Sequence, residues 1–287
     1  MAKYELLRRA ISQLPHLSEC IQLSVPPAAS FEEISKVHET GYVNALREGK
    51  LDPQMERRIG FPFSPELLER SRRSVGGTLA ACRKAIDEGI ALNLAGGTHH
   101  SFFDRGEGFC VLNDSVVALK KLQEEGLVRK AIVIDTDVHQ GNGTASLLAE
   151  DESIFTFSIH GAKNYPFKKE KSDLDVELPD ETGDSEYLEA LHGALRTLRD
   201  IEVDFCIFLS GADPYEEDRL GRLSVSKKGL QKRDSMVLEW CHQKDLKVAV
   251  TMGGGYAPEL NDIVEIHLQT VSEAYRFYQA YQEKKPF

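Results

Sequence analysis

The side chains in this sequence that could do chemistry gather directly after four short apolar runs. The segments that follow these runs read AGGTHH, DTDVHQGNG, SGADPY and MGGGY, so each polar side chain stands among or beside glycines. Among their side chains we single out three histidines, three aspartates and the tyrosine of the last segment: His99, His100, Asp135, Asp137, His139, Asp213 and Tyr256. Glycine lets the backbone approach a ligand closely. Such a convergence of carboxylates and imidazoles is typical of a metal-assisted hydrolytic site.

Asp137 and His139 have the spacing of two ligands of one metal ion. In extended chain, residues i and i+2 place their side chains on the same side of the backbone. A catalytic zinc takes three protein ligands and leaves a fourth position for water, and Asp213 is the natural third ligand. Two carboxylates acidify that water less than histidines would, so the site needs a strong base, which the His99–His100 pair can supply. Ferrous iron suits such a carboxylate-rich ligand set as well as zinc does.

Alternating strands and helices must position these residues. Five β-like runs are predicted at Ile90–Leu94, Ala131–Asp135, Ile154–Ser158, Phe205–Leu209 and Lys247–Thr251. Four of them are nearly continuous apolar segments, which is typical of strands buried on both faces of a parallel sheet. Helices are predicted from Ser30 through Arg47 and at Ser64–Glu88, Asp114–Glu125, Ser185–Arg199, Lys228–Lys244 and Pro258–Tyr278. The order predicts a single α/β domain over residues 1–287, with its ligands beyond the carboxyl ends of the strands.

Composition narrows the class of protein. The net charge of −11 argues against a nucleic-acid binder and is compatible with a cationic substrate. No apolar run approaches the roughly 20 residues of a membrane span, and the first residues lack the apolar core of a secretory signal. Five cysteines without a CxxC pair fit a reducing compartment, so we expect a cytoplasmic protein.

Four motifs in a fixed order resemble one known family. HHSFFDRGEGFC, IDTDVHQGNGT, LSGADPYEEDRLG and MGGGY are similar to the histone deacetylase and acetylpolyamine amidohydrolase superfamily, from about His38 to the C-terminus. The segments DRGEGFC, DVHQGNG and DRLGRLSVS resemble the class IV branch. The resemblance implies an arginase-like, three-layer fold, with a parallel sheet of about eight strands and helices on both faces. Three of those strands would lie in parts of the sequence that look irregular. The one long irregular stretch is Gly161–Asp184, which is either a binding rim or a solvated surface excursion.

The resemblance also implies a role for each site residue. The metal ligands would be Asp137, His139 and Asp213. The catalytic group would comprise His99, His100, Tyr256, Asp135 and Asn142. A structural potassium ion would be held by the chain at Asp135, Asp137, His139, Ser158 and Ile159. The acyl-binding tunnel would be formed by Gly108, Phe109, Leu220 and, near its base, Gly254.

The implied reaction is the removal of an acyl group from an amine by attack of metal-activated water. His100 would act as the base, His99 as an electrostatic partner, and Tyr256 as a hydrogen-bond donor to the developing oxyanion. The first candidate substrate is an acyl-lysine side chain, with an acetyl or a longer fatty acyl group. An acetylpolyamine or another small amide is the alternative, and a non-catalytic acyl-lysine binding protein is the non-enzyme alternative.

The sequence departs from the family pattern at three places. Asn142 stands where many members have an aspartate, and a neutral partner should make the second histidine less basic. Gln140 replaces a histidine that is common in other classes. The family usually has a segment before the first helix, whereas this sequence starts at that helix, so either its start is trimmed or an edge of the sheet is absent.

Overall fold

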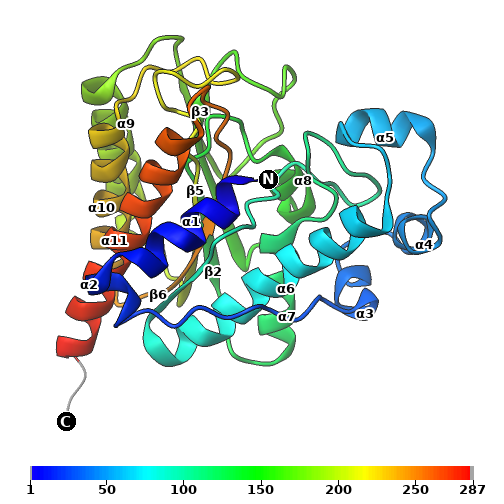
Figure 1. Cartoon of the computed structure of the whole chain (residues 1–287), viewed down its shortest axis with the longest axis horizontal. Coiled ribbons are helices and arrows are strands. Elements are labelled where there is room, and N and C mark those ends of the chain that lie inside the picture. Colours follow the sequence, from blue (N-terminus) through cyan, green and yellow to red (C-terminus); the bar gives the residue numbers. More distant parts are fainter. Residues whose placement is uncertain (1, 285–287) are drawn as a thin grey trace.

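A computed structural model describes residues 2–284 and arranges them around one parallel sheet (Figure 1). The strands are β1 (Ile90–Asn93), β2 (Ala131–Asp135), β3 (Ile154–Gly161), β4 (Leu174–Leu178), β5 (Phe205–Ser210) and β6 (Lys247–Met252). They lie in the order β1-β6-β5-β2-β3-β4, and every neighbouring pair is parallel. The predicted parallel α/β fold is therefore confirmed. The described residues form six strands, fewer than the eight that the resemblance implies.

Apolar runs become strands here because both faces of the sheet are covered. In β2, Ala131 and Val133 belong to one hydrophobic core, while Ile132 and Ile134 belong to the core on the opposite face. A continuous apolar run satisfies both faces at once. The strand β4 is not predicted from the sequence, because LDVEL alternates apolar with acidic residues and does not form an apolar run. Most of this strand is only half-buried. It lies inside the stretch that the sequence predicts to be irregular.

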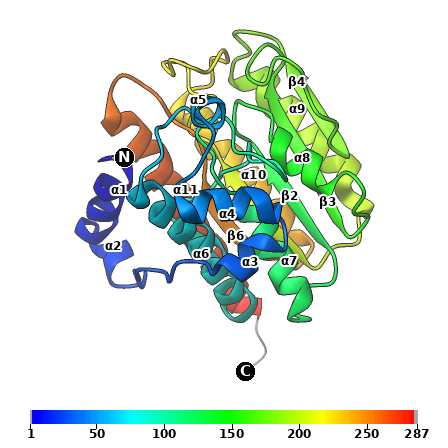
Figure 2. The same cartoon turned by 90° about the vertical axis from the view of Figure 1, so that its right-hand side faces the viewer.

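Helices cover the two faces of the sheet (Figures 1 and 2). One face carries α3 (Phe31–Ser35), α4 (Thr40–Glu48), α5 (Pro53–Ile59), α6 (Pro65–Glu88), α7 (Asp114–Glu124) and α8 (Asn142–Leu148). The other carries α9 (Asp184–Thr197), the 3-10 turn Leu198–Asp200, α10 (Lys227–Gln243) and α11 (Leu260–Lys284), with α1 (Ala2–Gln13) and α2 (Pro15–Ser18) packed at α11. None of the helices in residues 2–284 is both long enough and apolar enough to span a bilayer.

The helix predicted from Ser30 to Arg47 is two helices. The capping box of Ser30 and Glu33 starts α3 as expected, but α3 ends at Ser35 and α4 starts at Thr40. Between them, His38 Nδ1 lies 2.8 Å from the Phe102 carbonyl, and the Glu39 amide donates to Phe103 at 2.7 Å. These bonds tie the turn to the loop after β1, which a local sequence pattern cannot show.

The last helix is longer than predicted. It starts at Leu260 and extends to Lys284, past the expected end at Tyr278. Ala274, Phe277 and Tyr281 continue the apolar stripe at helical spacing and lie in the core under the sheet. The helix therefore continues for as long as it has a hydrophobic face to bury.

Candidate metal and catalytic site

The carboxyl ends of β1, β2, β5 and β6 bring the chemically active side chains together at one edge of the sheet. A cavity of about 1200 Å³ opens there. The expected site residues that line it are His99, His100, Asp137, His139, Tyr256, Gly108, Phe109 and Gly254. Asp135 and Asp213 lie directly behind them and are buried. The convergence expected from the four strand ends is thus present in the fold.

Asp137, His139 and Asp213 form a compact donor set. One ligand atom from each lies within 4.8 Å of the others, and all three residues are buried. His139 Nδ1 lies 3.0 Å from Asp137 Oδ1 and 3.2 Å from Asp213 Oδ2. Backbone amides orient both carboxylates, since Val138 donates to Asp213 at 2.9 Å and Gly254 donates to Asp137 at 2.7 Å.

The chemistry of this donor set fits a metal ion. Asp213 Oδ2 is buried and makes no hydrogen bond within residues 2–284, although His139 lies close to it. Burial and the neighbouring charge of Asp137 raise the pKa of Asp213 to about 7. A bound cation would satisfy this oxygen and neutralise both carboxylates. The backbone leaves room for nothing larger than hydrogen at Gly254, where a Cβ would stand 1.8 Å from Asp213 Oδ2.

His99 pairs with Asp135. Its Nδ1 lies 2.6 Å from Asp135 Oδ2, and its Nε2 lies 3.9 Å from Asp137 Oδ1. Burial opposes a positive charge on this imidazole, but the charges of Asp135 and Asp137 outweigh it and raise the pKa of His99 to about 9. The geometry therefore favours the protonated form of His99.

His100 has a neutral partner, and its pKa is shifted in the opposite direction from that of His99. Its Nδ1 lies 2.6 Å from Asn142 Oδ1, which only accepts, so the proton sits on Nδ1 and the lone pair on Nε2. Burial, and then the charges of His99 and His139, lowers the pKa of His100 well below its usual value. The ring centres of His99 and His100 are 4.1 Å apart. The pair thus divides into one charged and one neutral imidazole.

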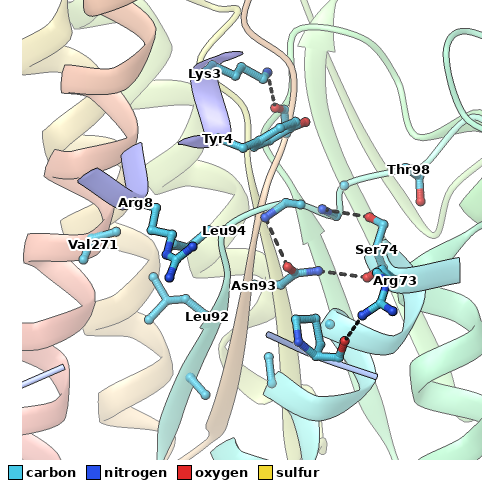
Figure 3. A pocket seen from close by; sticks show the side chains of 18 of the residues that line it. Lys3, Tyr4, Arg8, Arg73, Ser74, Leu92, Asn93, Leu94, Thr98 and Val271 are labelled. Atoms are coloured by element: carbon cyan, nitrogen blue, oxygen red, sulfur yellow. Dashed lines mark hydrogen bonds between the residues drawn. The ribbon is translucent and has the colours of Figure 1, made fainter. Parts of the chain in front are cut away.

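Tyr256 enters the cavity at the end of the glycine run after β6. Its backbone amide donates to Asp218 Oδ2 at 2.6 Å, and its ring centre lies 6.0 Å from that of Phe109. Burial and the charge of Asp213 raise the pKa of Tyr256, which keeps its hydroxyl protonated and able to donate. On α1, Lys3 donates to the Gly253 carbonyl at 3.3 Å (Figure 3).

The expected tunnel residues take different positions. Gly108 has a φ of +51°, and a Cβ there would stand 2.6 Å from His100 Cδ2, so glycine lets the loop lie against the imidazole. Phe109 is 41% exposed, and its ring centre lies 5.2 Å from that of Phe61. Leu220 is 45% exposed and, within the described chain, lies outside the lining of the cavity. Its carbonyl accepts from Asn164 at 2.7 Å.

Sequence reasoning missed Tyr165, which contacts the catalytic pair directly. Its ring meets His100 edge-on, with centres 4.9 Å apart, and its hydroxyl donates to Glu107 at 2.8 Å. It lies in the stretch predicted to be an irregular excursion, where no motif marked it. Gln140 holds this stretch against the site, since its amide donates to Glu170 at 2.7 Å and accepts from Glu170 at 2.9 Å. Gln140, which replaces a histidine common in other classes, therefore has a structural role.

The residues expected around potassium are neighbours at the sheet edge. Asp135 in β2 pairs in register with Ser158 in β3, and Ile159 follows with its side chain fully buried. The Asp137 amide donates to Asp135 Oδ1 at 3.1 Å. The Ser158 hydroxyl lies 2.9 Å from His160 Nδ1. The fold thus groups these residues, and the potassium ion remains a prediction.

Comparison with known proteins agrees with the motifs. Residues 1–271 match the histone deacetylase domain. An uncharacterized protein of Picosynechococcus is 41% identical over 232 residues, which is 80% of this chain and 77% of that protein. The acetoin utilization protein AcuC of Bacillus subtilis is 32% identical over 254 residues, which is 80% of this chain and 65% of AcuC.

Solved structures share the fold. An acetylpolyamine aminohydrolase from Burkholderia pseudomallei superimposes with a TM-score of 0.79 at 20% identity, covering 94% of this chain and 89% of that one. An HDAC homolog from Aquifex aeolicus gives a TM-score of 0.77 at 22% identity, covering 96% and 81%. With the domain match over nearly the whole chain, the conclusion follows that this protein belongs to the histone deacetylase family of amide hydrolases.

Proposed function

We propose that this protein hydrolyses the amide of an acyl-lysine side chain, with zinc in the site formed by Asp137, His139 and Asp213. One observation carries the proposal. Asp137 and His139 line one cavity with a charged and a neutral histidine, and Asp213 lies directly behind them, so that the three ligand atoms are within 4.8 Å of one another. This arrangement supplies a metal position and a base on the same side of the substrate carbonyl. When bound, zinc would polarise that carbonyl and acidify a water molecule.

The two histidines take different roles because their partners differ. A base must be neutral before it accepts a proton, and His100 is the neutral imidazole, with its Nε2 lone pair free. Its lowered pKa makes His100 a weaker base than the strong base expected from the sequence. His100 takes the proton of the attacking water and later gives it to the leaving amine. His99, held charged by Asp135, stabilises the negative charge that develops beside it. Asn142 fixes the tautomer of His100 without sharing its proton.

Tyr256 acts on the oxygen of the scissile amide. Its raised pKa keeps the hydroxyl protonated, so it donates a hydrogen bond to the oxygen as negative charge builds there. Asp218 and Phe109 hold the residue through its backbone amide and its ring. Gly108 and Phe109 form the wall past which the acylated side chain enters.

The size of the cavity bears on the acyl group. The lining of the cavity also includes the apolar side chains of Leu92, Leu94 and Val271 (Figure 3). The whole cavity of about 1200 Å³ extends along β1 as far as Lys84 and Glu88, and its apolar lining offers space beyond what an acetyl group requires. We therefore propose that the enzyme accepts longer fatty acyl groups as well as acetyl.

Three further assignments belong to this proposal. A structural potassium ion would lie near Asp135 and Ser158, where two strands end side by side. The motif DRLGRLSVS supports placement in the class IV branch. All five cysteines lie in the described residues as free thiols, which supports a cytoplasmic location.

A substrate panel tests the proposed function. Zinc-loaded protein is incubated with lysine peptides that carry acyl groups of increasing length, and with an acetylpolyamine, while released free amine is measured. Release from the peptides that exceeds release from the polyamine supports the acyl-lysine assignment. Faster turnover of the polyamine would reassign the substrate class. No release from any of these substrates, from protein with one zinc per chain, would refute hydrolysis of acyl-lysine and leave another small amide or a binding role.

A further inference from the structure

A buried ion pair on α10 lies behind the metal ligands and is not used by the chemistry above. Arg233 and Asp234 are each 0% exposed. Arg233 Nε donates to Asp234 Oδ1 at 2.9 Å, and Nη2 lies 2.8 Å from the same oxygen. A buried guanidinium carries a large desolvation penalty, and replacing such pairs with apolar residues often leaves stability unchanged or improves it. Stability alone therefore does not account for charges at this position.

The remaining donors of Arg233 reach the end of β5. Nη2 donates to the Ser210 hydroxyl at 2.8 Å, and Nη1 donates to the Gly211 carbonyl. On the other side, Thr270 of α11 donates to Asp234 Oδ2 at 2.7 Å. The planar guanidinium thus joins α10, α11 and the loop after β5 with donors in a fixed arrangement, which a lysine cannot reproduce.

Gly211 lies between the two carboxylate ligands. A Cβ on Gly211 would stand 2.6 Å from Asp137 Cα and 2.8 Å from Asp213 Oδ1. This peptide is therefore the spacer that separates the two aspartates. A rotation of the peptide would move Asp213, which is only two residues further along the chain, relative to Asp137.

The same loop also holds the glycine run before Tyr256 in place through backbone hydrogen bonds. Gly253 donates to the Ser210 carbonyl at 2.8 Å, and Ala212 donates to the Gly254 carbonyl at 2.9 Å. Gly254 in turn donates to Asp137 Oδ2 at 2.7 Å. A displacement of Ser210 would therefore move both carboxylates. It would move Asp213 through the connecting chain and Asp137 through its hydrogen bond with Gly254.

We propose that Arg233 is a positioning residue for the metal site. By holding the Ser210 hydroxyl and the Gly211 carbonyl, it fixes the separation of Asp137 and Asp213 that a metal ion requires. Asp234 neutralises the guanidinium and orients it. The inference rests on the proposed metal site, but it concerns metal affinity and does not depend on which substrate is hydrolysed.

The test compares metal affinity with fold stability. The double variant Arg233→Met/Asp234→Leu removes both charges and fills the space with apolar side chains, so it should fold. Leu238→Ala, a buried substitution on the same helix, is the matched control for loss of packing. Zinc affinity is measured by competition with a chromophoric chelator, with thermal unfolding measured in parallel. We expect the double variant to lose at least about tenfold in zinc affinity, and Leu238→Ala to stay within about threefold of wild type.

The outcomes separate the two proposals. Wild-type zinc affinity in the folded double variant would overturn the positioning role and leave the proposed function intact. Zinc bound normally by wild type without amide hydrolysis would refute the proposed function alone. If the double variant does not fold, Arg233→Lys decides, because lysine keeps the charge but cannot hold Ser210, Gly211 and Asp234 together. Undiminished zinc affinity in that variant would likewise overturn the positioning role.

Discussion

His38 should make stability depend on pH because it is buried in its neutral form. Its Nδ1 lies 2.8 Å from the Phe102 carbonyl, and its Nε2 accepts from the Asn113 amide at 3.0 Å. Burial lowers the pKa of His38 from 6.5 to about 4. Between these values the unfolded chain binds a proton that the folded chain does not. Stability from His38 is therefore complete above pH 6.5 and is lost as pH falls toward 4.

The magnitude follows from the two pKa values. One pKa unit corresponds to about 1.4 kcal/mol, so the complete loss is about 3 kcal/mol, of which about 2 kcal/mol is reached by pH 5. Urea unfolding of wild type and His38→Asn at pH 7, 6 and 5 measures this difference. The variant is less stable at pH 7, because the Asn113 amide loses its acceptor, but it should lose about 2 kcal/mol less than wild type on acidification to pH 5.

A control separates proton binding from general destabilisation. Tyr42→Phe removes the hydroxyl that donates to the Val111 carbonyl at 2.8 Å in the same region. It should lower stability by about 1 kcal/mol at every pH and keep the wild-type pH dependence. Equal losses between pH 7 and pH 5 in wild type and His38→Asn would refute the assignment of a neutral, buried His38.

Three further substitutions test the site itself. Gly254→Ala should abolish metal binding, because its Cβ would stand 1.8 Å from Asp213 Oδ2, whereas Gly193→Ala, with open space around it, should keep one metal per chain by elemental analysis. Tyr256→Phe should retain the metal but lose about 100-fold or more in kcat, and unchanged turnover would remove its role at the oxyanion. Asp137→Ala should leave the protein without bound zinc after dialysis, and full occupancy would exclude Asp137 as a ligand.

The sequence predicts the sheet and the site well where each depends on local signals. Both faces of β2 are covered, so Ala131–Asp135 is a nearly continuous apolar run. That run is enough to predict the strand. The motif residues follow strand ends, and parallel strands bring their carboxyl ends to one edge. His99, His100, Asp137 and His139 therefore meet in the fold as expected.

The features that were missed depend on contacts between distant segments. Tyr165 lies against His100 because Gln140 holds its loop, and neither contact has a local sequence pattern. Arg233 looks like a surface residue of a helix, and only the fold shows that its guanidinium reaches Gly211. Asp218 stands inside a quoted motif, so the signal was present, but its bond to the Tyr256 amide needed the structure.

Free-amine release from an acyl-lysine peptide measures metal-assisted hydrolysis at this site. Wild type and Asp213→Asn are each assayed as purified, after removal of metal with a chelator, and after addition of zinc. We predict that wild-type turnover disappears on chelation and returns with zinc, and that Asp213→Asn is inactive throughout. Turnover that survives complete chelation, or that is equal in Asp213→Asn, would contradict metal-assisted hydrolysis at this site.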